Sequence, residues 1–145
     1  MKMIDIGKKD RTLREAVVEG RVYLKPSVIL AIKRKEIPKG DVLTSAKLAG
    51  ILAAKNTPHL IPLCHPIPIE YANIDFFLKK NEIRIRTTIR GVAKTGLEME
   101  GLVATTMAGL TIYDMCKMLD RGIEITDIKL IKKSGGKSGS YIRKD

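Results

Sequence analysis

An acid and a base are spaced three residues apart near the end of a predicted helix. Residues 98–119 have the apolar periodicity of one long helix, and side chains three apart on a helix can touch. Asp114 and Lys117 can therefore form an ion pair. It is either a solvated pair at the helix end or a partly buried acid–base pair that faces a ligand.

The same helix face carries a second acid at its other end. Steps of three and four residues lead from Glu100 through Val103, Met107 and Leu110 to Asp114. We expect the apolar middle of this stripe to belong to the core. Small residues that permit close packing lie beside it, at Gly101, Ala104 and Ala108.

A thiol and an imidazole lie on a proline-rich segment, residues 57–68, whose four prolines predict a rigid, irregular connection. A zinc site at Cys64 and His65 would need more ligands, because His59 is the only other histidine. A Cys–His dyad is disfavoured, because adjacent residues of an extended segment point in opposite directions. A ligand contact through His65 and a purely structural histidine both remain open.

Lysines alternate with glycines in the tail KKSGGKSG, residues 132–139. The tail lacks the first glycine and the following helix of a Walker phosphate loop. Its backbone N–H groups and lysines can still bind phosphate, and a flexible basic tail is the alternative. In the predicted strand 82–93, Ile83, Ile85 and Ile89 share one face. Arginines 84, 86 and 90 share the other, where they either hold phosphates or are solvated.

The order of predicted elements indicates an α+β fold of the ferredoxin-like type, with helices on one face of a mainly antiparallel sheet. We expect a single domain, residues 1–145. Strands are predicted at 15–25, 67–79, 82–93 and 123–132, with a bulge near residues 72 and 73. Helices are predicted from Pro26 to about residue 37, from an N-cap at Asp41 to residue 56, and over 98–119.

The composition favours a polyanionic partner in a reducing compartment. The formal net charge is +11, which suits nucleic acid, a membrane surface or a small phosphorylated ligand, and a solvated lysine-rich surface is the alternative. Two cysteines cannot make a disulfide framework, and no apolar stretch reaches the length of a signal core or a membrane span. We therefore expect a cytoplasmic protein.

Four motifs together resemble one known family. PLCHP (62–66), KTGLEMEGL (94–102), LTIYDMCK (110–117) and KSGGKSG (133–139) are similar to those of the cyclic pyranopterin monophosphate synthase (MoaC) family, and the likeness extends from Ile4 to Ser140. The resemblance implies a lyase of molybdenum cofactor (molybdopterin) biosynthesis. Such an enzyme rearranges a 3′,8-cyclised GTP into a cyclic phosphate pterin and releases pyrophosphate.

The resemblance also implies a set of site residues. Asp114 and Lys117 would be the catalytic acid–base pair. Residues expected to bind substrate or support the site are Leu63, Cys64, His65, Glu98, Met99, Glu100, Lys39 and Lys137. Departures from the family pattern are mild, at Ile67, Leu97 and Gly101. We expect no protein-bound metal or cofactor, and a Mg²⁺ ion on the triphosphate stays open.

The expected partners are a triphosphorylated nucleotide as substrate and the upstream radical GTP cyclase, a functional partner that makes this substrate. Neither nucleic acid nor a membrane is expected. Glu100 and Asp114 are 14 residues apart, about 21 Å along a helix. We therefore expect sites assembled from two subunits, compatible with the family's homohexamer, a trimer of dimers. The alternative is a small basic RNA-binding α+β module, which leaves the acids on the helix unexplained.

Overall fold

The computed structural model describes residues 1–145 and contains four helices and five strands. Their order is β1 (Thr12–Tyr23), α1 (Pro26–Lys33), α2 (Val42–Lys55), α3 (Thr57–Leu60), β2 (Tyr71–Leu78), β3 (Glu82–Ala93), α4 (Glu98–Cys116), β4 (Glu124–Ser134) and β5 (Tyr141–Ile142).

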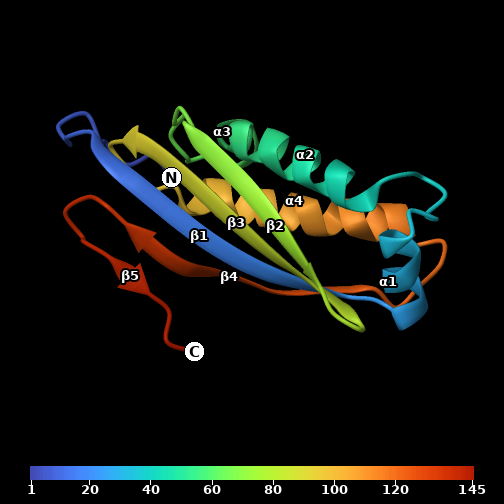
Figure 1. The fold of residues 1–145 in the computed structure, drawn as a ribbon. Helices are drawn as coiled ribbons and strands as arrows, with labels where there is room; N and C mark the ends of the chain where they lie inside the picture. The colour runs from blue at the N-terminus through green and yellow to red at the C-terminus, as the bar shows by residue number, and fades with distance from the viewer.

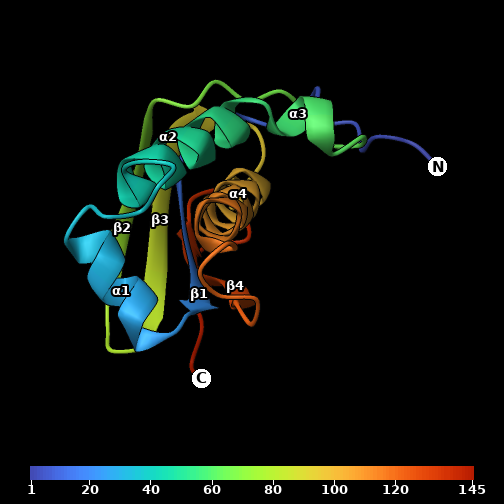
Figure 2. The ribbon, with the colours of Figure 1, turned by 90° about the vertical axis from the view of Figure 1, so that its right-hand side faces the viewer.

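The strands form one sheet in the order β2-β3-β1-β4-β5, and every neighbouring pair is antiparallel. Figures 1 and 2 show the helices on one face of this sheet, with α2 and α4 running side by side across it. The first four strands and the helices between them give the β-α-β-β-α-β succession of ferredoxin-like folds. The expected α+β fold is confirmed.

Alternation along β3 separates the core from the open face of the sheet. Ile83, Ile85 and Ile89 are buried beneath the helices, as their spacing predicted. On the open face, Arg86 donates a hydrogen bond to Glu19 of β1 at 2.9 Å. Most of the arginine row is paired in this way with carboxylates of the neighbouring strand.

The long helix α4 buries a different face from the one predicted. Leu110 is 48% exposed, and Val103 and Met107 are only half-buried, so the expected apolar core in the middle of that stripe is wrong. The buried face contains the small residues instead, together with Ile112. The reason is steric, because only small side chains fit where α4 lies against both the sheet and α2.

Helix α2 packs against α4 at a glycine. A side chain at Gly50 would come within 2.9 Å of the Ala104 carbonyl oxygen and would collide with Ile74. The backbones of the two helices therefore touch at this point, and no larger residue fits there. At the start of α2, the Asp41 side chain accepts a hydrogen bond from the Thr44 N–H at 3.1 Å, which confirms the predicted N-cap.

Several local predictions differ from the structure. The predicted bulge in β2 is absent, since the register between β2 and β3 is unbroken and Ile67 and Ile69 precede the strand. Register shifts occur instead between β1 and β4. The proline-rich segment begins with the one-turn helix α3, which tolerates Pro58 in its first turn. The tail adds the short edge strand β5.

None of the helices is both long and apolar enough to cross a membrane.

Candidate active site

A pocket of about 320 Å³ lies at the N-terminal end of α4. Its walls come from three segments: the loop after α3, the β3–α4 connection with the first turn of α4, and the chain before β1, residues 1–11, which we call the N-terminal arm. Predicted site residues that line it are Leu63, Cys64, His65, Glu98, Met99 and Glu100. The structure thus brings together six of the ten residues implied by the family motifs.

Glu100 is the most unusual side chain of this pocket. It is only 2% exposed, and its Oε1 atom is buried without a hydrogen-bond partner. Burial raises the pKa of the Glu100 carboxyl above its ordinary value, and the charge of Glu98 adds to the effect. A carboxyl in such surroundings holds its proton more readily and can donate it to a ligand.

Cys64 lies beside Glu100 and is half-buried. Burial raises the pKa of the Cys64 thiol, and the nearby Glu100 raises it further. A raised pKa disfavours the thiolate, so Cys64 suits packing against a ligand better than nucleophilic attack. His65 is the only imidazole that lines the pocket.

Glu98 is paired with a lysine that sequence reasoning did not select. Lys133, the next-to-last residue of β4, places its Nζ 2.6 Å from Glu98 Oε1, and both side chains are partly buried. Lys133 lies opposite Ala16 in the sheet, and directly opposed residues point to the same face. Ala16 faces the helices, so the register of β4 is the signal that could have identified Lys133.

Lys137 lies apart from this pocket. It is exposed in the turn between β4 and β5 and lines a smaller neighbouring pocket with Arg14 and Gly136. Lys9, on the N-terminal arm, lines both pockets.

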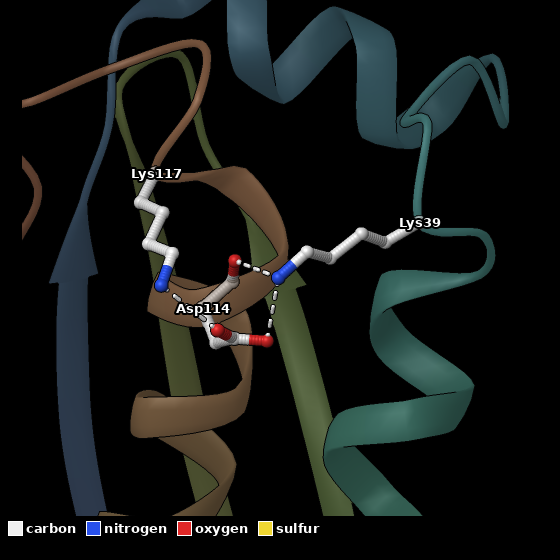
Figure 3. Close-up of polar contacts among 3 residues, drawn as sticks. All are labelled: Lys39, Asp114 and Lys117. Carbon is white, nitrogen blue, oxygen red and sulfur yellow. Dashed lines mark hydrogen bonds and ion pairs between the residues drawn. The ribbon is translucent and has the colours of Figure 1, made fainter.

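A second charged cluster lies at the C-terminal end of α4 (Figure 3). Asp114 Oδ2 lies 2.9 Å from Lys39 Nζ, and Asp114 Oδ1 lies 3.2 Å from Lys117 Nζ. Lys39 also donates to the backbone oxygen of Asp114 at 3.1 Å. Hydrogen bonds from Lys39 and then from Lys117 lower the pKa of the Asp114 carboxyl, so it is a carboxylate held between two ammonium groups.

This second cluster is open to solvent in one chain. Asp114 is 57% and Lys117 53% exposed, so the expected i, i+3 ion pair forms without the partial burial that a ligand-facing pair would have. Residues 100 and 114 are at opposite ends of α4, about 21 Å apart along its axis. The pocket and the Asp114 cluster therefore do not meet within one chain.

No three or more His, Cys, Asp or Glu side chains gather closely enough to hold a metal ion.

The fold and the two clusters define a class: an α+β protein whose ionisable pocket and exposed acid–base cluster suit proton transfer on a charged ligand. A sequence model of the MoaC family matches residues 3–136, and the chain belongs to that family. Similar proteins named cyclic pyranopterin monophosphate synthase share 51% identity in Thermoanaerobacter sp. (strain X514) and 48% in Roseiflexus castenholzii. The alignments cover 98% and 97% of this chain and 91% and 90% of the relatives. Another so named, from Clostridium perfringens, is 50% identical over 96% of this chain and 89% of its own length.

Proposed function

We propose that this chain is a cyclic pyranopterin monophosphate synthase, a lyase that converts 3′,8-cyclised GTP into cyclic pyranopterin monophosphate and pyrophosphate. The observation that carries the proposal is the pocket at the start of α4, where Glu98–Glu100, Cys64 and His65 meet in a chain of the MoaC family. Its relatives bear that enzyme's name over nearly their whole length.

The side chains suit the steps of such a rearrangement. Rebuilding a purine-derived ring as a pterin requires repeated proton transfers, for which Glu100, His65 and the Asp114–Lys117 pair are the donors and acceptors. Closing the cyclic phosphate expels pyrophosphate, so cations must surround the departing charge. Lys39 and Lys117 supply two of them.

Lys133 belongs to the same machinery in this proposal. Its ion pair with Glu98 holds both side chains at the pocket, since the two are partly withdrawn from water. It complements Lys137, which the family motifs suggested and which lies in the adjoining pocket.

We further propose that the complete site forms between two copies of the chain, within a homohexamer built as a trimer of dimers. The separation of the pocket from the Asp114 cluster supports this, because each of the two lacks ionisable groups that the other has. The apolar side chains Leu48 and Leu52 on α2 and Leu110 on α4 are also exposed in a single chain, as expected of surfaces that another copy covers.

The proposal assigns the upstream radical GTP cyclase as the source of the substrate and the cytoplasm as the location. Both cysteines are free, which fits a reducing compartment. An RNA-binding role is less well supported, since the arginines of β3 that suggested it are partly engaged by glutamates and the relatives are named as synthases.

The test is to incubate the purified chain with 3′,8-cyclised GTP and to quantify the cyclic pterin and pyrophosphate. We expect equal amounts of both. Lys117→Ala should abolish product while circular dichroism shows an unchanged fold. Lys80→Ala, which removes an exposed lysine from the β2–β3 turn, is the matched control and should retain activity. Salt-sensitive RNA binding without any turnover would contradict the proposal and favour the RNA-binding alternative.

A further inference from the structure

Asp120 is a buried carboxylate in the turn that follows α4. It is 5% exposed and takes part in none of the ion pairs of the chain. Its two oxygens each accept a backbone N–H: Oδ1 from Gly122 at 2.8 Å and Oδ2 from Lys25 at 2.9 Å. Because a buried carboxylate is costly unless its oxygens are satisfied, both hydrogen bonds are needed where Asp120 lies.

The bond to Lys25 joins two segments that are 95 residues apart in the sequence. Lys25 is the N-cap residue of α1, and its own side chain makes no capping hydrogen bond. Asp120 therefore satisfies the N-cap N–H from outside the helix, as the glutamate of a capping box does from within it. Figure 1 shows α1 at the C-terminal end of α4, so this bond fastens the start of one helix to the end of the other.

The chain between Lys25 and Lys39 has little freedom of its own. Helix α1 is anchored in the core by Val28, Ile29 and Ile32. After it, the Gly40 N–H donates to the Ile37 oxygen at 3.0 Å and closes the turn that carries Lys39. A shift at the start of α1 is therefore carried along this segment to Lys39.

The cations of the Asp114 cluster lie on the two segments that Asp120 joins. Lys117 precedes Asp120 by three residues, and Lys39 follows α1. Figure 3 shows the two lysines reaching Asp114 from opposite sides. Lys39 Nζ donates to both Oδ2 and the backbone oxygen of Asp114, at 2.9 and 3.1 Å. Because hydrogen bonds weaken steeply with distance and angle, a small displacement of the Lys39 turn breaks one of the two.

We propose that Asp120 is a positioning residue that holds Lys39 against Asp114. Without its carboxylate, the Lys25 N–H loses its partner, and the start of α1 can move away from the turn after α4. The effect of Asp120 on turnover rests on the proposed function, whereas its effect on the contact between Lys39 and Asp114 does not.

The test is cross-linking of the full chain with a carbodiimide, which joins an amine to a carboxylate without a spacer and so reports only pairs in contact. Peptide mass spectrometry quantifies the Lys39–Asp114 cross-link, with Lys133–Glu98 at the other end of α4 as the internal reference. We expect Asp120→Ala to lower the yield about fivefold, the factor by which losing a helix cap shifts an equilibrium. Asp120→Asn keeps the shape and one acceptor oxygen, so it should fold even where Asp120→Ala does not and should lower the yield by less.

Two comparisons separate positioning from a general loss of stability. Ile85→Val removes a buried methyl group from β3 and should leave the Lys39–Asp114 yield unchanged. The cross-link between Lys117 and Asp114 should persist in Asp120→Ala, because these residues are neighbours at one helix end. An unchanged Lys39–Asp114 yield in both Asp120 variants overturns the proposal. Equal loss of the Lys117–Asp114 cross-link also overturns it, since the end of α4 would then have frayed.

Steady-state kinetics with cyclised GTP gives the consequence for turnover. Asp120→Ala should lower kcat/KM about 10- to 100-fold, as expected when a cation is displaced by about 1 Å, and Asp120→Asn should restore part of it. Ile85→Val should change kcat/KM less than about twofold. A lower Lys39–Asp114 yield with unchanged kcat/KM refutes the role in turnover and leaves the structural role standing. A lower yield in a chain whose wild type shows no turnover refutes only the synthase proposal.

Discussion

Two inactive variants with changes at opposite ends of α4 should restore each other's activity when they assemble together. Glu100→Gln alters the buried acid of the pocket, and Lys117→Ala removes a cation of the exposed cluster. Because about 21 Å of helix separates the two positions, a single chain cannot bring both to one ligand. In a mixed pair, one of the two shared sites receives its pocket from the Lys117→Ala chain and its charged cluster from the Glu100→Gln chain, and so contains no substitution.

The size of the restored activity follows from counting sites. Random assembly of equal amounts makes about half of all pairs mixed, and half of the sites in a mixed pair are intact. The mixture should therefore show about a quarter of the wild-type rate per chain. Mixed pairs isolated with two different affinity tags should show about half of it.

The assay is pterin formation from cyclised GTP after the two variants are produced together. The matched control combines Glu100→Gln with His65→Ala, since both changes affect the same pocket and every site in the mixed pair keeps one of them. That control should remain inactive. If tandem-purified pairs of Glu100→Gln and Lys117→Ala chains are as inactive as their parents, each chain builds its own site and the two-subunit proposal is wrong.

Two other predictions concern stability and are measured by urea unfolding. Gly50→Ala should lower the free energy of unfolding by about 1–3 kcal/mol, since the new methyl group must displace Ala104 of α4. The control Gly122→Ala, where the nearest atom is 3.4 Å away, should change it by less than about 0.5 kcal/mol. Equal effects of the two substitutions would contradict the close packing of α2 on α4. The pKa of Glu100 in the folded chain is raised above its ordinary value of 4.5. Between these two pKa values the folded chain binds more protons than the unfolded chain, so the free energy of unfolding falls as the pH rises through that range. Glu100→Gln removes this loss, so its stability relative to the wild type should be greater at about pH 7 than at about pH 4, and a pH-independent difference would argue against a perturbed carboxyl.

Regular alternation and capping signals made most of the fold predictable. The isoleucines of β3 and the N-cap Asp41 lie as the sequence indicated, because each depends on residues nearby in the chain. The bulge in β2 was wrong, because apolar residues before a strand can mimic a change of register within it. The burial of α4 was also misread, since hydrophobicity alone does not show that two neighbours approach so closely that small residues are needed.

Which residues share the larger pocket was predictable, and the contacts of the charged groups were much less so. The motifs brought Cys64 and Glu100 into one expected set, and they do share a pocket. The partners of the charged groups could not be read from spacing. Lys133 reaches Glu98 only through the register of β4, and Lys39 reaches Asp114 across 75 residues of sequence.

The contact of α2 with α4 at Gly50 also determines which wall of the pocket at the start of α4 can move. The loop with Cys64 follows α2 and α3, which both pack against α4, and Glu100 belongs to α4, so these two walls are joined through packed helices. The third wall, the N-terminal arm, belongs to no helix or strand and is tied to the β3–α4 connection by a hydrogen bond from Lys94 Nζ to the Gly7 oxygen at 3.3 Å. A ligand larger than the pocket therefore gains room by displacing the N-terminal arm, and the free energy needed to displace the arm weakens its binding.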